Sequence, residues 1–111
     1  MTKEVVHTSA APEAVGPYSQ AIKDGGLVFC SGQVALDASS GELTGTTVSE
    51  QTRRALDNLS AVLLAAGTDL DRVVKVTAYL TDMDDFPEFN EVYGTYFAND
   101  PPARATVGVS A

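Results

Sequence analysis

Two stretches of the sequence have the apolar spacing of helices that cover a sheet from one side. Apolar residues recur at i, i+3 and i+4 positions between residues 47 and 67, and a second stripe, rich in aromatic residues, runs from residue 86 to about residue 98. A β-rich run at residues 73–80 separates the two stripes, and another run begins at residue 103. A two-layer domain has only one place in which to bury both stripes. We therefore expect both helices on the same face of a sheet.

The ends of these helices carry local signals. Thr47 and Glu50 fit a capping box, and Gly67 is placed where helices commonly stop. In the second helix we expect Asp85 to act as the N-cap and Pro87 to sit in the first turn.

The N-terminal third predicts antiparallel strands. Asp24-Gly25-Gly26 is a turn signal between the runs 18–23 and 27–33, which indicates a hairpin, and residues 3–8 form a candidate edge strand. The predicted order is β-β-β-α-β-α-β, with residues 73–80 as a central strand. The fold class is therefore α+β, a two-layer sandwich with a mixed sheet, formed as a single domain over residues 1–111.

Composition excludes several kinds of partner. The 111 residues carry a formal charge of −8, from 15 acidic residues against 7 lysines and arginines that are scattered along the chain. This balance argues against nucleic acid, which is bound by a basic face. Cys30 is the only cysteine and is interpreted as a small buried hydrophobe. No apolar signal core or membrane-length run is found, which predicts a soluble cytoplasmic protein that does not bind a membrane.

No metal site is expected. The acidic turn at residues 81–85 lacks the glycine and the ligand spacing of a calcium loop, and it is better explained as the entry to a helix. His7 has no second histidine or nearby cysteine with which to bind zinc.

The final run, residues 101–109, contains the strongest candidate for binding. Alternation along a strand puts Arg104 and Thr106 on one face and the residues at 103, 105, 107 and 109 on the other. We expect the second set to pack on the helices, and the face with Arg104 to be solvated or covered by other subunits. Arg104 then has two interpretations, an ordinary strand arginine with its head in water or a ligand for a small carboxylate.

Five segments together resemble the RidA/YjgF/UK114 family, in that family's order and spacing. They are Gly16–Ala21 (GPYSQA), Ser31–Gln33 (SGQ), Gln51–Leu59 (QTRRALDNL), Phe89–Tyr93 (FNEVY) and Pro102–Arg104 (PAR). The resemblance extends from Pro12 to the end of the chain. It implies a chorismate-mutase-like fold and a homotrimer with clefts between subunits.

The resemblance also implies an activity. Such proteins hydrolyse reactive enamine and imine intermediates, such as 2-aminoacrylate and 2-iminobutanoate, to 2-keto acids and ammonia. No cofactor or metal is implied, because the imine is already electrophilic. In this chain Arg104 would hold the substrate carboxylate and Thr106 would help to position water. Ser31 and the Gly32 backbone would add donors near the same anion, Tyr18 would form a wall of the pocket, and Asn90 would line it from its own or a neighbouring subunit.

One departure from the family matters for catalysis. Relatives continue into a last strand that carries a glutamate thought to activate water, whereas this sequence ends at Ala111. We expect the sequence shown to be part of a longer chain that supplies this glutamate, because loss of a sheet strand would expose a long edge with unpaired backbone groups. If the glutamate is truly missing, this favours an alternative, a trimeric binding or regulatory protein for small carboxylates or 2-keto acids. A third possibility is the ribonuclease or translation-inhibitor activity attached to the family's name, which the acidic charge and the single histidine oppose.

Overall fold

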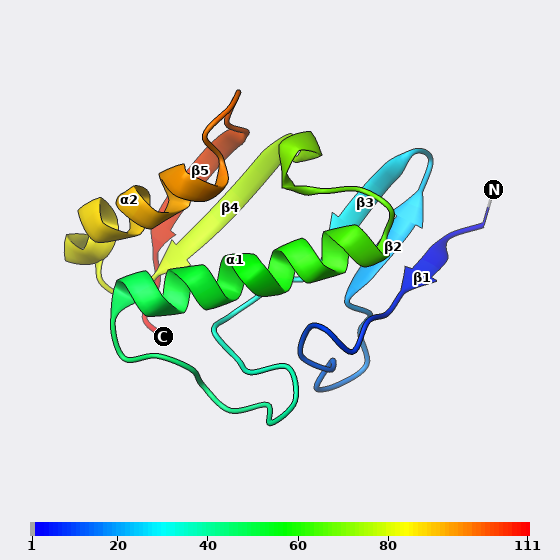
Figure 1. Cartoon of the computed structure of the whole chain (residues 1–111), viewed down its shortest axis with the longest axis horizontal. Coiled ribbons are helices and arrows are strands. Elements are labelled where there is room, and N and C mark those ends of the chain that lie inside the picture. The colour runs from blue at the N-terminus through cyan, green and yellow to red at the C-terminus, as the bar shows by residue number, and fades with distance from the viewer. Residues whose placement is uncertain (1) are drawn as a thin grey trace.

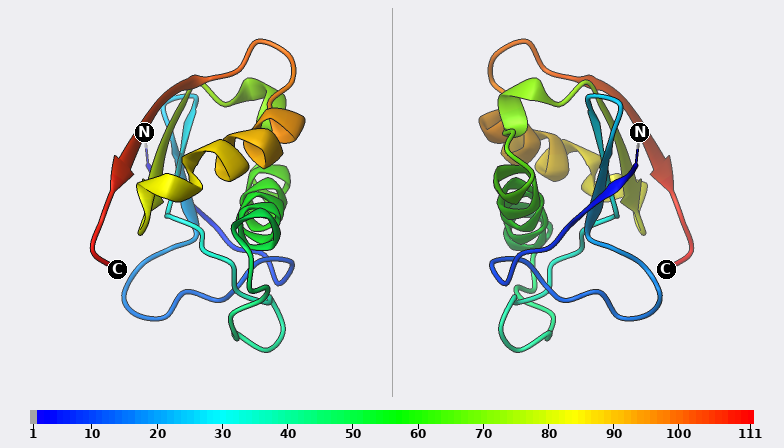
Figure 2. Two further views of the ribbon diagram at one scale, coloured as in Figure 1. Left: turned by 90° about the vertical axis from the view of Figure 1, so that its left-hand side faces the viewer. Right: turned by 90° about the vertical axis from the view of Figure 1, so that its right-hand side faces the viewer.

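The computed structural model describes residues 2–111 and arranges them in two layers, with the strands on one side and both helices on the other (Figure 1, Figure 2). The elements are β1 (Glu4–Val6), β2 (Ala21–Asp24), β3 (Leu27–Cys30), α1 (Val48–Ala65), β4 (Lys75–Leu80), α2 (Phe86–Tyr96) and β5 (Ala103–Gly108). Short 3₁₀ turns, η1 (Leu70–Arg72) and η2 (Met83–Asp85), precede β4 and α2. The predicted order, the α+β class and the placing of both helices on one face are confirmed.

The strands form two hydrogen-bonded groups. β1, β2 and β3 pair antiparallel, while β4 pairs with β5 in parallel, the chain crossing between them through α2. Within residues 2–111 no ladder joins β3 to β4. The prediction of a central strand at residues 73–80 is therefore wrong for this structure, because β4 has a strand partner on one side only. Density of β-formers indicates a strand but not how many neighbours it has.

The hairpin has the predicted turn and shorter arms. Gly25 and Gly26 both have positive φ, 61° and 80°, a conformation that glycine adopts without steric cost. The ladder runs from the Ala21–Cys30 pair to the Asp24–Leu27 pair. Residues 18–20 and 31–33 therefore lie beyond its end and are available to form loops.

Helix α1 begins and ends as its sequence predicts. The Thr47 hydroxyl accepts a hydrogen bond from the Glu50 N–H at 3.1 Å, and the Glu50 carboxylate accepts one from the Thr47 N–H, also at 3.1 Å. Gly67 follows the helix with a φ of 88°. Its 18 residues carry α1 across both groups of strands (Figure 1). The helix is thus the element that joins the two halves.

Helix α2 starts differently from the prediction. Asp85 occupies the N-cap position, but its side chain makes no capping hydrogen bond. Asp82 instead accepts a hydrogen bond from the Asp84 N–H at 2.9 Å and caps η2, the turn that leads into α2. Pro87 lies in the first turn as expected. Among residues 2–111 no helix is long and apolar enough to cross a membrane.

Two separate clusters form the core beneath α1. We call the first the aliphatic cluster, under β1–β3: Val6, Ala11, Ala21, Val62 and Ala66. The second, which we call the aromatic cluster, lies between α1, α2 and β4–β5: Leu56, Phe89, Tyr93 and Phe97. Because Leu56 belongs to one cluster and Val62 to the other, successive turns of α1 tie them together.

Candidate functional site

Arg104 lies on the face of β5 that is turned toward the helices. Its partner in the ladder is Val76, and the partner of Thr106 is Ala78. Both β4 residues pack against the aromatic cluster, and directly paired residues share a face of the sheet. The opposite face of β5 presents Ala103, Ala105 and Val107, which are exposed.

This arrangement corrects the predicted orientation of the last strand. The alternation was right, but the sets were assigned to the wrong faces, since the alanine set is exposed and the arginine set faces the helices. The physical reason is the arginine stem, a chain of methylenes that packs well against apolar neighbours while its charged head finds a separate environment. The expectation that Arg104 would lie on the uncovered face is therefore wrong.

The environment of the Arg104 guanidinium is aromatic. Its Cζ atom lies 4.7 Å from the centroid of the Tyr93 ring, 5.5 Å from that of Phe86 and 5.6 Å from that of Phe89. These distances are within the range of cation–π attraction. The ion pairs recorded within residues 2–111 are His7–Glu13 and Lys23–Glu4. Arg104 is thus a half-buried cation with no carboxylate partner in the described chain.

Two hydroxyl groups near Arg104 are buried without a hydrogen-bond partner among the described residues. They are Oγ1 of Thr106, two positions along the same face of β5, and Oη of Tyr93. Burial raises the pKa of the Tyr93 phenol, and the nearby Arg104 charge partly opposes this rise. The phenol is therefore neutral at ordinary pH. Buried polar groups are normally paired, so unpaired ones beside an unneutralised cation mark this region as a candidate site.

Asn90 belongs to the same region of α2. It follows Phe89 directly, and its helical spacing from Phe86 and Tyr93 places it along the stripe that contacts Arg104. Its side chain is half-buried. Three of the predicted site residues, Asn90, Arg104 and Thr106, thus lie on α2 and β5, the two elements that meet at the aromatic cluster.

The other predicted residues form a second group at the end of the hairpin. Tyr18 and Gly32 line a small cavity of about 60 Å³ that also includes Gln20 and Gln33. Tyr18 is 52% exposed, and its hydroxyl accepts a hydrogen bond from the Val15 N–H at 3.1 Å. None of Asn90, Arg104 and Thr106 lines this cavity. The described chain does not gather all the predicted residues around one cavity.

Ser31 and Gly32 differ in the donors they have free. The Ser31 hydroxyl donates to the Ser19 carbonyl at 2.6 Å, and the Ser31 N–H donates to the Gln20 carbonyl at 3.0 Å. Both donors of Ser31 are therefore engaged within the chain. The Gly32 N–H has no recorded partner in residues 2–111, and a Cβ at Gly32 would meet nothing within 4 Å. Open space around a backbone donor suits a ligand that approaches closely.

The loop that carries Tyr18 is held by one buried side chain. The Gln20 carboxamide accepts a hydrogen bond from the Thr8 N–H at 2.7 Å and donates to the carbonyls of Thr8 and Pro12 at 3.1 and 2.9 Å. Gln20 is only 3% exposed. A buried amide with both ends paired fixes the loop in one arrangement, and hence fixes the place of Tyr18.

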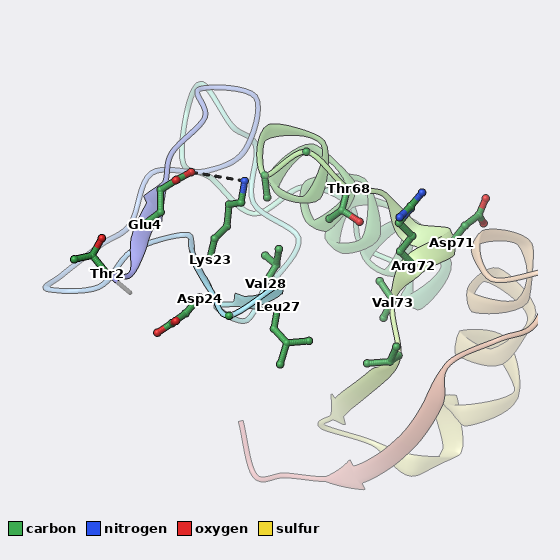
Figure 3. A pocket seen from close by; sticks show the side chains of 15 residues that line it. Thr2, Glu4, Lys23, Asp24, Leu27, Val28, Thr68, Asp71, Arg72 and Val73 are labelled. Carbon is green, nitrogen blue, oxygen red and sulfur yellow. Dashed lines mark ion pairs between the residues drawn. The ribbon is translucent and has the colours of Figure 1, made fainter.

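A much larger cavity lies away from both groups. It measures about 750 Å³ and opens between the β2–β3 turn and the segment that joins α1 to β4 (Figure 3). Lys23 points into it but is paired with Glu4 at 3.7 Å, and Arg72 lies across from it next to Asp71 (Figure 3). None of the predicted site residues lines this cavity. Size alone therefore does not locate the site.

For Cys30 and His7 the structure favours a packing or surface role over a chemical one. Cys30 is half-buried against the aliphatic cluster, and this burial raises the pKa of its thiol, which disfavours a reactive thiolate. His7 is exposed and lies 2.9 Å from Glu13. Among the residues that the structure describes, no group of three or more His, Cys, Asp or Glu side chains could hold a metal ion.

Fold and site together define a small α+β protein in which an unneutralised arginine lies between a parallel strand pair and an aromatic helix face. Comparison with known proteins gives the family. The family profile described as Endoribonuclease L-PSP matches residues 8–111. The mouse protein named 2-iminobutanoate/2-iminopropanoate deaminase is 49% identical over 109 residues, which cover 98% of this chain and 81% of the mouse protein. Other relatives of similar identity are named only as RutC family proteins.

Solved structures agree. The Rid family protein YyfA of Yersinia pestis superposes with a TM-score of 0.96 at 43% identity, covering 99% of this chain and 88% of that one. Escherichia coli TdcF, solved with bound serine, superposes with a TM-score of 0.91 at 36% identity, covering 96% of this chain and 86% of that one. The chain belongs to the RidA/YjgF/UK114 family, as its five sequence segments predicted.

Sequence reasoning missed the partners of Arg104. Phe86, Phe89 and Tyr93 were interpreted as part of a core stripe or a helix start, and their contact with the guanidinium was not foreseen. The signal that could have found them is the recurrence of aromatic residues at positions 86, 89 and 93, on the helix that directly precedes the strand with the arginine.

Proposed function

We propose that this protein hydrolyses small 2-imino acids, and the enamines that tautomerise to them, to 2-keto acids and ammonia. The observation that carries the proposal is the half-buried Arg104 guanidinium, which has no carboxylate partner within residues 2–111. An unpaired cation in a partly desolvated place is costly, and a ligand carboxylate would offset that cost with two parallel hydrogen bonds. The proposed substrates, 2-iminobutanoate and 2-aminoacrylate, carry that carboxylate next to the reacting carbon.

The chemistry needs positioning more than a cofactor. Water adds to the imine carbon as the C=N π electrons move to nitrogen, the nitrogen takes up a proton, and the resulting carbinolamine expels ammonia to leave the keto group. Arg104 would fix the carboxylate and so the reacting carbon. The Thr106 hydroxyl, which has no other partner in the described chain, would help to hold the attacking water. Asn90 would line the same side of the pocket.

We further propose that the two groups of site residues meet between copies of the chain in a homotrimer. The strand face opposite the helices is apolar and exposed, with Phe29 at 59% and Tyr79 at 66%. Apolar surface of this kind is typical of an interface. Because Arg104 lies on the helix-facing side of β5, the neighbouring copy would have to reach it past the free edge of that strand, and there Tyr18, Ser31 and Gly32 of one subunit would complete the pocket around Arg104 of the next.

The relatives support the class of ligand. The mouse relative is named for deamination of 2-iminobutanoate and 2-iminopropanoate, and E. coli TdcF was solved with serine, which also carries a carboxylate beside a nitrogen-bearing carbon.

The decisive test is the rate of hydrolysis of freshly generated 2-iminobutanoate, above the uncatalysed rate, for the wild type and for Arg104→Ala. We expect kcat/KM to fall roughly a hundredfold or more, the size of a lost buried ion pair. Arg104→Lys is the matched control, because it keeps the positive charge but loses the planar pair of N–H donors that binds both carboxylate oxygens. Its kcat/KM should lie between that of the wild type and that of Arg104→Ala. Equal rates in wild type and Arg104→Ala would contradict the proposal.

A second candidate is a non-catalytic binding or regulatory protein for small carboxylates or 2-keto acids. It is favoured by one observation, that in residues 2–111 no carboxylate pairs with Arg104 or hydrogen-bonds to the Thr106 hydroxyl to act as a base. Binding of 2-oxobutanoate that needs Arg104, with no turnover of the imine, would identify this function.

The family description also names an endoribonuclease. A charge of −8 and a single histidine do not favour RNA cleavage in this chain. Tight RNA binding at physiological salt, falling steeply as salt is raised, would argue for it.

A further inference from the structure

Three aromatic rings surround the one cation of the candidate site, and they come from two turns of the same helix. Phe86, Phe89 and Tyr93 of α2 all lie within 5.6 Å of the Arg104 Cζ atom, measured to their centroids. Phe89 and Tyr93 are buried, at 7% and 6% exposure, so their rings cannot swing away. The rings and the guanidinium form one packed unit between α2 and β5.

The identity of these neighbours decides what Arg104 can still do. A carboxylate neighbour would cancel the charge of the arginine and occupy its N–H donors. An aromatic ring face attracts the cation through its quadrupole, and the in-plane N–H donors of the guanidinium stay free. The rings therefore stabilise a buried charge without using the fork that a planar carboxylate needs.

We propose that Phe86, Phe89 and Tyr93 are positioning residues that fix the Arg104 guanidinium and leave its N–H donors free for the carboxylate of an incoming ligand. The ligand's identity as an imine substrate rests on the proposed function, but the aromatic support of the arginine does not. Any small carboxylate that binds Arg104 is affected in the same way.

Tyr93 contributes most among the three. Its ring is the nearest to the cation, and it is held between Phe89 at 5.4 Å and Phe97 at 4.6 Å, centroid to centroid. Its hydroxyl has no partner in the described chain. It is thus the ring, rather than the hydroxyl, that supports Arg104, and phenylalanine at this position should serve nearly as well.

The chain offers a matched control in Phe97. Phe97 is 5% exposed against 6% for Tyr93, lies in the same aromatic cluster one helical turn further on, and makes no recorded cation–π contact with Arg104. Tyr93→Leu and Phe97→Leu each remove one buried ring from the same core. They should cost similar stability, so a difference in ligand binding between them reports on the contact with Arg104.

The experiment measures KM and kcat for 2-iminobutanoate, and the Kd of 2-oxobutanoate by calorimetry, in the wild type and in three variants. For Tyr93→Leu we expect KM and Kd to rise roughly five- to tenfold with a smaller change in kcat, which matches the loss of one partly desolvated cation–π contact. Tyr93→Phe should stay within about twofold of the wild type, because it keeps the ring. Phe97→Leu removes a neighbour of Tyr93 but no contact with Arg104, so KM and Kd should rise clearly less than in Tyr93→Leu.

A second readout does not depend on activity. In ¹⁵N NMR the Arg104 Nε–H resonance should carry a ring-current shift that is lost in Tyr93→Leu and kept in Phe97→Leu. Equal increases of Kd in Tyr93→Leu and Phe97→Leu, or an Arg104 resonance unmoved by Tyr93→Leu, would overturn the proposal. Failure of the deaminase function gives a different result: no turnover in the wild type, with 2-oxobutanoate still bound through Arg104 and still weakened by Tyr93→Leu.

Discussion

The two halves of the molecule fill their cores with different kinds of side chain. Under β1–β3 the core consists of small aliphatic groups such as Val62, and the loops around it are held by buried amides, Gln20 and Asn58. Under β4–β5 the core is a run of aromatic rings, and the group it surrounds is a cation. Buried amides whose N–H donors are paired with backbone carbonyls hold these loops rigidly. Rings that leave an arginine unpaired make a place for a ligand.

The largest effect expected from this comparison is on stability, through the aromatic cluster. Phe97→Ala should lower the free energy of unfolding by about 3–5 kcal/mol, because Phe97 is buried and removal of its ring leaves a cavity that the surrounding residues can close only in part. Val62→Ala in the aliphatic cluster removes less surface and should cost roughly 2 kcal/mol. Urea unfolding of both variants measures the difference. Equal losses would mean that the two clusters contribute equally to the free energy of unfolding.

Removal of a buried amide should cost somewhat less of the free energy of unfolding than removal of the Phe97 ring. Asn58 is 1% exposed, and its carboxamide donates to the carbonyls of Val34 and Leu36 at 3.1 and 2.9 Å. Asn58→Ala leaves both carbonyls without that donor and should cost about 2–3 kcal/mol. It should also speed hydrogen exchange across residues 31–47, the loop that Asn58 holds against α1.

Asn90 is the matched control for the stability of that variant. It is also a helical asparagine, but it is half-buried and its side chain makes no recorded hydrogen bond within residues 2–111. Asn90→Ala should therefore change the free energy of unfolding by less than about 1 kcal/mol. A loss as large as that of Asn58→Ala would show that the two asparagines do not differ in the way that the structure describes.

The sequence predicted the features that depend on near neighbours in the chain. The capping box of Thr47 and Glu50, the glycine turn of the hairpin and the stop at Gly67 each involve residues no more than a few positions apart. Contacts between distant segments were not predictable in this way. The hydrogen bonds of Asn58 cross more than 20 residues of chain, and nothing in the helical pattern marks Asn58 as their donor.

The candidate site shows the same limit more sharply. Strand periodicity placed Arg104 and Thr106 together correctly, because alternation is a property of the strand alone. Which of the two faces meets the helices depends on packing across the domain, and hydrophobicity suggested the wrong one. A pattern that ranks alanine as inside and arginine as outside does not include the apolar stem of arginine or the affinity of its head for rings.

The smallest effect concerns Tyr96, which lies where α2 crosses α1 at the edge of the aromatic cluster. Burial and the hydrogen bond from its hydroxyl to Asp57 at 2.7 Å raise the pKa of the phenol to about 12, from its usual value near 10. The folded protein therefore holds this proton at a pH where the unfolded chain has lost it. A raised pKa of this kind stabilises the fold fully below about pH 10 and less and less as pH rises toward about 12.

The urea midpoint should accordingly fall as pH rises from about 10 to about 12, and Tyr96→Phe should make that fall shallower. The change is modest because the hydroxyl lies near solvent. Tyr93 acts in the same direction, since burial raises the pKa of its phenol as well, so Tyr93→Phe should also reduce the slope. No phenol in the aliphatic half packs in its core, and a slope unchanged in both variants would mean that alkaline sensitivity does not arise in the aromatic half. A slope reduced in both variants would show that this alkaline sensitivity arises from Tyr93 and Tyr96, the two phenols of α2.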